Sequence, residues 1–479
     1  MSTSRREFLR NSAIAGLGLG LFGATARAGQ YGVSADAQSK LPDIGATRPR
    51  PAGQKPVHDL TTKPLDTVRI ALIGGGHPGG RGTSLLRDAL HTKLGVVTAV
   101  CDLRKERAQM AADIVKKATG KEPAVYGGAE DSWEELIKRD DIDVVIIASP
   151  WEWHVPMAVG AMEAGKHAFV EVSAAVTVED CWRLVDTSER TQKHCVMLEN
   201  CCYGENEMFV LNMARQGVFG ELTHAECAYI HDLRWMLYQL GTEGDWRRAY
   251  HHRLDGNLYP THGLGPVAQY LGINRGDQFK FLVSVSSPEA GLSAYRKKHN
   301  PNGGKHDAEK YICGDMNTSI IKTELGRSIM IQHDVISPRP YSRINALSGT
   351  GGTFFDYPAR LALDDGKKYG LAVPHGSHDW LGDADMKKMR EMFTHPLIKR
   401  LKEASKGAGH GGMDFVMMYR HLECIKSGAT PDSTAYDAAS WSSILELSAR
   451  SVGTGSCPVN IPDFTRGLWK TLQPLGVIA

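Results

Sequence analysis

The chain has 479 residues, of which 42% are hydrophobic, and a formal net charge of +2. Its 56 basic and 54 acidic residues are dispersed, which argues against nucleic acid as a partner, and the length suits two or three domains. Nine cysteines without a Cys-x-x-Cys pair favour neither a disulfide scaffold nor a zinc site. We expect buried free thiols, including the adjacent pair Cys201 and Cys202.

The N-terminus has the features of an export signal. Residues 4–10 read SRREFLR, and an apolar run, AIAGLGLGLFG, leads to a small-x-small site at residues 26–28. This run is too short to span a bilayer, and no later run is long enough. We predict a twin-arginine signal peptide over residues 1–28 and a periplasmic protein without a transmembrane segment. Residues 29–64 are rich in Pro, Gly, Lys and Thr, and we expect an extended arm or linker, either wrapped around a neighbouring subunit or disordered.

From residue 65 onward, short β-branched runs alternate with stretches of helical periodicity, as in βαβ units. The runs are VRIALIG, GVVTAVCD, DVVIIASP, HAFVEV and HCVMLEN. Nearly continuous hydrophobic strands are typical of a parallel sheet covered on both faces. We therefore predict an α/β fold whose N-terminal Rossmann dinucleotide-binding domain covers residues 65–200.

The first predicted strand leads into the glycine-rich turn GGGHPGGRG. Gly74, Gly76 and Gly79 satisfy the Gly-x-Gly-x-x-Gly fingerprint, which lets the backbone approach a pyrophosphate at a helix N-terminus. The surplus Gly80-Arg81-Gly82 lengthens the loop, and Arg81 is expected to add positive charge near the phosphates. Asp102 ends the next predicted strand, where a carboxylate accepts hydrogen bonds from the ribose and repels a 2′-phosphate, so we predict NAD rather than NADP.

The segment DVVIIASPWEWHVPMAVGAMEAGKHAFVEVSAAVTVEDCWRLV resembles the Gfo/Idh/MocA group of nicotinamide-dependent sugar oxidoreductases. In that group one strand ends in Thr-Pro-Asn-x-x-His and a later strand in Glu-Lys-Pro. This chain has SPWEWH at the first place and Glu171-Val172-Ser173 at the second. It therefore lacks the lysine that commonly contacts both cofactor and substrate in the group.

Longer stretches narrow the resemblance. CVMLENCCYGENEMFVLNMARQGVFGEL, AECAYIHDLR, GNLYPTHGLGPVAQYLGINRGD and PYSRINALSGTGGTFFDYP are similar to glycoside hydrolase family 109, the NAD-dependent α-N-acetylgalactosaminidases. Besides Gly74 and Gly76 of the fingerprint, the resemblance implies cofactor contacts from Gly80, Arg81, Asp102, Trp151, Glu152, Trp153, His154, Glu171, Val172 and Asn200. It implies sugar contacts from Tyr229, Arg248, Tyr259, Pro260, Thr261, His262 and Tyr341. Arg247 adjoins Arg248, which leaves the choice between these two arginines open.

The family's chemistry is a redox cycle. NAD takes a hydride from C3 of the sugar, the C2 proton is removed, the C1 substituent leaves, water adds and the hydride returns to C3. The tightly bound NAD is thus recycled, and no carboxylate pair of an ordinary glycosidase is needed. His262, assisted by Tyr259, is the catalytic candidate, because histidine and tyrosine exchange protons when neighbours tune them. The pair His251-His252 and the glycine-flanked His410 lack metal-ligand spacing, and we predict no metal.

Residues 201–479 are expected to form a substrate-binding α+β domain with a mostly antiparallel open sheet. LTHAECAYIH, FKFLVSVSS and TSIIKTELGRSIMIQHDV, the last broken at Gly326, read as strands. DFVMMYRHLECIKSG and AYDAASWSSILELSARSV have helical periodicity and are expected to pack back onto the Rossmann domain. We expect a homo-oligomer formed through the C-terminal sheet.

Two other functions share these features. The first is an exported NAD-dependent sugar dehydrogenase or oxidoreductase, against which Val172 at the lysine position argues. The second is a catalytically silent NAD-binding sensor or scaffold, which the presence of His262, Tyr259 and Asp102 together disfavours.

Overall fold

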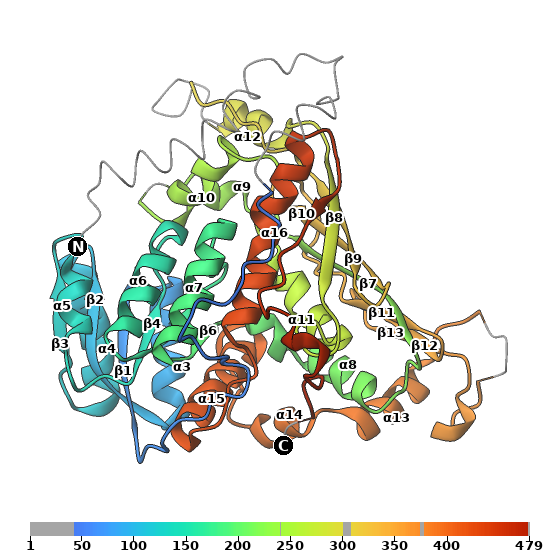
Figure 1. The fold of residues 1–479 in the computed structure, drawn as a ribbon, viewed down its shortest axis with the longest axis horizontal. Coiled ribbons are helices and arrows are strands. Elements are labelled where there is room, and N and C mark those ends of the chain that lie inside the picture. The colour runs from blue at the N-terminus through green and yellow to red at the C-terminus, as the bar shows by residue number, and fades with distance from the viewer. Residues whose placement is uncertain (1–42, 240, 300–307, 374–377, 478–479) are drawn as a thin grey trace.

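The computed structural model describes residues 43–239, 241–299, 308–373 and 378–477. The predicted signal peptide, residues 1–28, lies outside them. Two sheets stand on either side of a layer of helices, and the last helices of the chain return to the first sheet (Figure 1). Among the described residues, no helix has the length and apolar character needed to cross a membrane.

The first sheet has six parallel strands in the order β3-β2-β1-β4-β5-β6. Its strands are β1 (Val68–Ile73), β2 (Gly95–Asp102), β3 (Ala124–Gly127), β4 (Val144–Ile147), β5 (His167–Val170) and β6 (Cys195–Met197). The five predicted strands are present, and the sequence analysis missed only the short β3. The strand order reverses between β1 and β4, and α/β folds of this kind bind ligands beside the carboxyl ends of two such strands.

Five helices cross between these strands. They are α3 (Arg81–Thr92), α4 (Lys105–Thr119), α5 (Ser132–Ile137), α6 (Trp151–Glu163) and α7 (Val178–Thr191). Thr177 caps α7 through its side chain, which accepts a hydrogen bond from the backbone N–H of Asp180. All four residues of β4 are fully buried, as expected for a strand covered on both faces.

The second sheet has eight strands in the order β13-β12-β11-β7-β10-β9-β8-β14 and is antiparallel except between β7 and β10. The strands are β7 (Leu222–Ile230), β8 (Phe279–Ser286), β9 (Asn317–Thr323), β10 (Ser328–Asp334), β11 (Ala346–Gly349), β12 (Gly352–Phe355), β13 (Arg360–Leu363) and β14 (Val459–Asn460). The predicted run around Gly326 is the β9–β10 hairpin, whose turn places Gly326 at φ +84°. The prediction of a mostly antiparallel second sheet is confirmed.

The remaining helices fill the space between the sheets and the rim of the molecule. They are α8 (Glu205–Arg215), α9 (Arg234–Leu237), α10 (Glu243–His251), α11 (Thr261–Leu271), α12 (Gly291–His299), α13 (Asp383–Phe393), α14 (Pro396–Leu401), α15 (Met413–Ser427) and α16 (Ala435–Gly453), with 3-10 turns η1 (Asn200–Tyr203), η2 (Lys367–Tyr369), η3 (Gly409–Gly412) and η4 (Leu468–Lys470). As predicted, α15 contacts α3, and α16 contacts α7 and β6.

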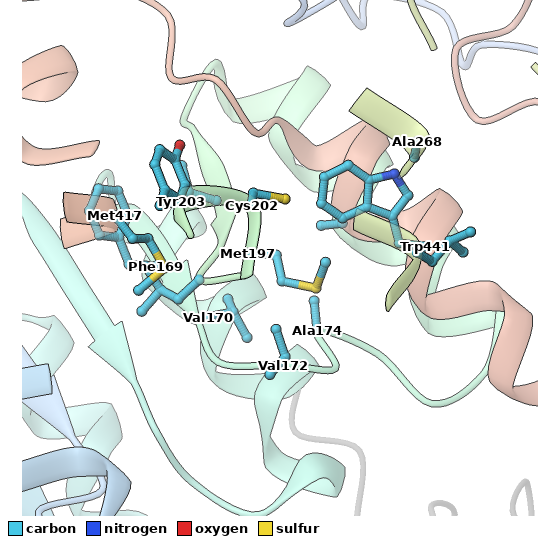
Figure 2. Close-up of a cluster of buried hydrophobic side chains, with 14 of the residues drawn as sticks. Phe169, Val170, Val172, Ala174, Met197, Cys202, Tyr203, Ala268, Met417 and Trp441 are labelled. Atoms are coloured by element: carbon cyan, nitrogen blue, oxygen red, sulfur yellow. The ribbon is translucent and has the colours of Figure 1, made fainter. Parts of the chain in front are cut away.

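One hydrophobic core joins the two sheets. Phe169 and Met197 come from the first sheet, Met417 from α15 and Trp441 from α16, and all four are at least 99% buried (Figure 2). Cys202 of η1 belongs to this cluster. All nine cysteines are free, and every one except the half-buried Cys457 is buried, so the thiols pack as the sequence analysis expected.

Residues 43–64 of the predicted arm lie on their own chain. Arg50 forms an ion pair with the buried Glu189 of α7, at 3.0 Å. The backbone N–H of Val57 donates to the hydroxyl of Tyr436 in α16, which in turn donates to Glu189. Residues 43–64 are therefore ordered on their own chain, which corrects the expectation of disorder for this part of the arm.

Candidate functional site

A cleft of about 450 Å³ opens where the order of the first sheet reverses. One wall is the glycine loop between β1 and α3, another is the segment after β4, and a third is residues 241–247 of the second domain. Of the predicted cofactor contacts, the cleft is lined by Gly74, Gly76, Gly80, Arg81, Asp102, Trp151, Trp153, His154, Glu171 and Val172. The volume is within the range typical of small-molecule and cofactor sites.

Two glycines of the loop allow very close backbone contacts. Gly74 has φ +95°, and a Cβ atom there would lie 2.5 Å from the carbonyl oxygen of Ala148. A Cβ on Gly82 would lie 1.8 Å from the carbonyl oxygen of Gly74, whereas a Cβ on Gly79 would meet nothing closer than His77, at 3.8 Å. The close packing of helix on strand therefore depends on Gly82, so Gly82 and not Gly79 is the third glycine of the motif.

Asp102 is held at the end of β2 with its carboxylate facing the loop. Its Oδ2 accepts a hydrogen bond from the backbone N–H of Gly76, and its Oδ1 accepts one from that of Arg104, both at 2.9 Å. Each oxygen has a second lone pair for a ribose hydroxyl. The residues around the cleft thus fit a dinucleotide: a tight glycine loop at a helix N-terminus and a fixed carboxylate on the neighbouring strand.

The guanidinium of Arg81 is hydrogen-bonded to two carboxylates. Its Nε donates to Glu171 at 2.8 Å and its Nη1 donates to Asp414 at 2.6 Å. This arrangement differs from the expectation of a phosphate-neutralising arginine, because most of its charge is balanced inside the protein. Arg81 nevertheless lines the cleft, since its side chain crosses from the glycine loop to the end of β5.

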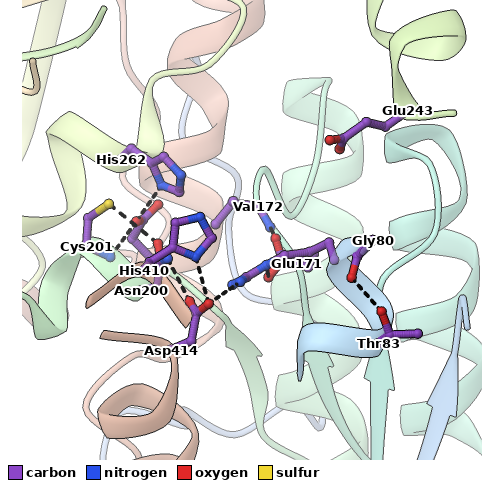
Figure 3. A network of polar contacts seen from close by, with 12 residues as sticks. Gly80, Thr83, Glu171, Val172, Asn200, Cys201, Glu243, His262, His410 and Asp414 are labelled. Atoms are coloured by element: carbon purple, nitrogen blue, oxygen red, sulfur yellow. Dashed lines mark hydrogen bonds and ion pairs between the residues drawn. The ribbon is translucent and has the colours of Figure 1, made fainter. Parts of the chain in front are cut away.

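Asp414, at the start of α15, is the centre of a polar network (Figure 3). It is fully buried and accepts hydrogen bonds from Arg81, from Asn200 at 2.7 Å and from the Nδ1 of His410 at 2.7 Å. Burial acts to raise the pKa of Asp414, but the hydrogen bonds and charges of His410 and Arg81 hold that pKa well below its ordinary value. Asn200, an expected cofactor contact, lies in this network and is not among the residues lining the cleft.

His410 lies in the glycine-rich segment of residues 407–412 and has φ +49°. Its side chain is 59% exposed, and the hydrogen bond to Asp414 raises its pKa above the ordinary value. The charge of Glu171 also acts to raise the pKa of His410. Sequence reasoning passed over His410 because it judged metal-ligand spacing alone. The flanking glycines were the available signal, since a left-handed backbone presents a side chain from a tight loop.

Most of the predicted residues after β4 support the cleft wall. The Nε1 of Trp151 donates to the carbonyl oxygen of Val172 at 3.0 Å. Both ring nitrogens of His154 lie 2.8 Å from backbone carbonyls, those of Ser173 and Ser149. These contacts favour the charged ring, but burial outweighs them and lowers the pKa of His154 to about 4. His154 therefore links the segments that follow β4 and β5 through their backbone carbonyls. Glu152 is exposed and is not among the lining residues.

The catalytic candidates form a linked group. The Nδ1 of His262 lies 2.7 Å from Oε1 of Glu199, and its Nε2 lies 3.4 Å from the hydroxyl of Tyr259. Glu199 is 1% exposed. Burial acts to raise its pKa, yet the charge and hydrogen bond of His262 make the net shift a lowering. A carboxylate–imidazole–phenol array of this kind orients the ring and exchanges protons. Sequence reasoning missed Glu199, although it directly precedes the predicted Asn200.

The array depends on how closely α11 approaches its neighbours. A Cβ on Gly263 would lie 2.6 Å from the backbone nitrogen of Ala228 in β7, and one on Gly265 would lie 2.9 Å from Cγ of Glu199. Because neither residue has a Cβ atom, the first turn of α11 fits between β7 and η1. The predicted Pro260 precedes this turn, and Thr261, fully buried, begins it.

The predicted sugar contacts divide into two groups. Tyr229 stacks on Tyr259 with ring centroids 4.5 Å apart and meets Tyr341 edge to face at 6.4 Å, which brings these rings together beside His262. Arg248 points away from these rings, because its guanidinium bonds Asp245, Glu309 and the carbonyl oxygen of Leu237.

Of the two adjacent arginines on α10, Arg247 lines the cleft and Arg248 does not. The guanidinium carbon of Arg247 lies 5.0 Å from the ring centre of Tyr259 and 5.4 Å from that of Trp151. The structure therefore places Arg247, and not the expected Arg248, beside the catalytic candidates.

One group of potential metal ligands occurs among the described residues. Glu199, Cys201 and His262 have donor atoms within 4.8 Å of one another. Glu199 and His262 already bond each other directly, and burial raises the pKa of the Cys201 thiol well above its ordinary value. His262 thus engages Oε1 of Glu199, while Oε2 of Glu199 has no hydrogen-bond partner among the described residues.

Comparison with known proteins gives the family context. Residues 203–471 match the model for the glycosyl hydrolase 109 C-terminal domain, and residues 68–199 match that of the oxidoreductase family with an NAD-binding Rossmann fold. A glycosyl hydrolase family 109 protein of Shewanella baltica (strain OS185) is 49% identical over 432 residues, which is 90% of this chain and 92% of the relative. A protein of Shewanella oneidensis named alpha-N-acetylgalactosaminidase is 47% identical, with 91% and 93% of the two chains covered.

Solved structures show the same fold at low sequence identity. An NAD-binding oxidoreductase from Klebsiella pneumoniae is 17% identical with a TM-score of 0.63, covering 82% of this chain and 99% of that one. A levoglucosan dehydrogenase in complex with NADH is 20% identical with a TM-score of 0.58, covering 83% and 100%. The family match shows an NAD-binding Rossmann domain, and the glycine loop and Asp102 of this domain line the cleft.

Proposed function

Since the chain belongs to glycosyl hydrolase family 109, we propose that it hydrolyses terminal α-N-acetylgalactosaminides through oxidation at C3, elimination across C1 and C2, addition of water and reduction at C3. Its family makes the chain an NAD-dependent glycoside hydrolase. The identity of the sugar and the reaction cycle are what we propose. Bound NAD supplies a hydride acceptor and donor at C3. The observation that carries the proposal is the Glu199–His262–Tyr259 array beside the NAD cleft.

The array supplies the bases that the cycle requires. His262, oriented by the ionised Glu199, accepts a proton at Nε2, the nitrogen that faces the hydroxyl of Tyr259. Tyr259 extends this proton path. The two residues act on the C3 hydroxyl and on the C2 proton, which becomes acidic once C3 is a ketone.

His410 supplies the third group, a proton donor for the leaving oxygen. Its Nδ1 is fixed by Asp414, its raised pKa keeps the ring charged at higher pH, and its exposure leaves Nε2 available. Arg247 and Tyr229 bind the sugar, because a guanidinium fork and a phenol beside the array suit hydroxyl and acetamido groups.

The test is to incubate the purified protein, without added NAD, with an aryl α-N-acetylgalactosaminide in heavy water. We expect release of the aryl group and deuterium at C2 of the released sugar. Oxidation of the sugar with the glycosidic bond intact would instead identify a dehydrogenase. A protein that binds NAD and reacts with no sugar would be a sensor.

We further propose that the protein is exported to the periplasm by the twin-arginine route with NAD already bound. The arginine pair, the apolar run and the small-x-small site at residues 26–28 support this proposal. Replacing Arg5 and Arg6 with lysine should leave the precursor in the cytoplasm, as fractionation would measure. Export unchanged by these substitutions would contradict the proposal.

We also propose a homo-oligomer formed through the second sheet. Val285 and Ile320 on neighbouring strands of this sheet are 55% and 45% exposed. Replacing both with glutamate should reduce the molar mass measured by light scattering to that of one chain. A wild-type protein that is monomeric would contradict the proposal.

A further inference from the structure

Arg81 connects two segments that are far apart in the sequence. It begins α3 directly after the glycine loop, and it bonds Asp414 at the start of α15, directly after the His410 loop. α3 and α15 pack against each other, so the two segments form one unit. Figure 3 shows Glu171, Asp414 and His410, and Arg81 bonds the two carboxylates between which it lies.

The network has one arginine and two buried carboxylates. Glu171 and Asp414 are 7% and 0% exposed, and Arg81 bonds both. Without the guanidinium, two carboxylates would remain buried with like charges, which favours the binding of a proton by one of them. Glu171, whose pKa is raised by burial, and Asp414 would compete for that proton. Where it binds Asp414, it removes the anion that holds Nδ1 of His410.

The position of His410 depends on that anion. The glycines around His410 give the segment little preference of its own, and its backbone is left-handed at His410, Gly411 and Gly412. The hydrogen bond to Asp414 selects one ring orientation and leaves Nε2 directed away from the network.

We propose that Arg81 is a positioning residue for His410: it keeps Asp414 ionised and in place, and so links the loop that binds the cofactor to the group that protonates the leaving oxygen. This inference rests on the proposed function. In the step concerned, Nε2 of His410 gives its proton to the glycosidic oxygen. The C1–O bond breaks with its electron pair going to that oxygen, and the pair at C2 forms the C1–C2 double bond.

Several charged groups act on His410 and shape its titration. They are Asp414 on α15, Arg81 and Asp88 on α3, Glu171 after β5 and His231 after β7. Burial and the charge of Asp414 raise the pKa of Asp88 to about 7. Removing the positive charge of Arg81 therefore changes the pH profile of the protonation step, whereas loss of a merely structural arginine would scale the rate equally at every pH.

The experiment compares Arg81→Gln, Arg81→Lys and the control Arg87→Gln, each in the wild-type and His410→Ala backgrounds. Arg87 lies on the same helix but is exposed and bonds only a loop carbonyl among the described contacts. For each protein we would measure bound NAD, the melting temperature, and kcat against pH for two glycosides. One glycoside has a good leaving group, 4-nitrophenol, which needs little protonation, and the other has a poor one, methanol.

We expect Arg81→Gln to lower kcat about 10²-fold for the methyl glycoside, the usual scale of general acid catalysis, and far less for the 4-nitrophenyl glycoside. It should alter the pH profile, have little further effect once His410 is alanine, and be partly rescued by lysine. Arg87→Gln should leave all values unchanged. Non-additivity of this kind indicates that two residues act as one unit.

Three outcomes would overturn the inference. The first is equal losses for both glycosides. The second is a loss that multiplies with that of His410→Ala, and the third is full recovery when NAD is added. The last outcome would make Arg81 a cofactor contact only. A wild-type protein that releases no aryl group would refute the proposed function itself, which separates the two failures.

Discussion

Substituting alanine for Gly82 tests how the cofactor loop is built. The new Cβ would lie 1.8 Å from the carbonyl oxygen of Gly74 and 3.0 Å from its carbon. These are backbone atoms, so no side chain can swing aside, and the loop and the first turn of α3 must separate. Overpacking of this kind costs about 1–3 kcal/mol. Because the displaced atoms form the dinucleotide turn, we expect the dissociation constant of NAD to rise about 10- to 100-fold.

The assay is the amount of NAD that remains with the purified protein, together with its dissociation constant from titration of the apo form. Gly79→Ala is the matched control, since its Cβ would meet only His77, at 3.8 Å. We expect this control to keep its NAD. If Gly82→Ala binds NAD as the wild type does while Gly79→Ala loses it, then the assignment of the third glycine to Gly82 is refuted.

Other predictions concern proton transfer and specificity. Glu199→Gln removes a buried charge-assisted hydrogen bond worth about 1.5–3 kcal/mol, so kcat/KM should fall about 10- to 150-fold with NAD content unchanged. Arg247→Gln should raise KM at constant melting temperature, whereas Arg248→Gln should lower the melting temperature, because Arg248 is buried among its partners. The pKa of His410 is raised, so its protonated form persists above the ordinary pKa of histidine. Activity on substrates with poor leaving groups should fall as the pH rises through the pKa of His410. The His410→Ala variant should lack this fall in activity at high pH. Asp102→Ala should weaken NAD binding and improve NADP binding, measured by competition.

The first domain could be predicted well because each of its signals is local. A strand, a glycine turn and a helix follow one another, and Asp102 stands at the end of the next strand. The placement of the third glycine could not be predicted, because it depends on which Cβ would meet the carbonyl of Gly74. Only the packing of helix on strand decides that.

The polar network could not be predicted from spacing. Arg81 is separated from Glu171 by 90 residues and from Asp414 by 333 residues. A basic residue in a phosphate loop suggests phosphate, and nothing local reveals two buried carboxylates. Likewise, neighbouring arginines on α10 point in different directions, so the choice of Arg247 over Arg248 required the helix to be placed against the cleft.

Segments from both ends of the chain cover the nucleotide-binding domain, which limits how far this domain can serve as an independent module. The arm before β1 is anchored to α7 and α16, and α15 and α16 come from the far end of the chain. The dinucleotide unit therefore has its cover supplied from both ends of the polypeptide. Residues 68–199 cut out alone would expose the apolar surfaces of α3, α7 and β6 that these segments bury. An engineer who wishes to exchange cofactor domains between relatives has to transplant the arm and the last two long helices with them.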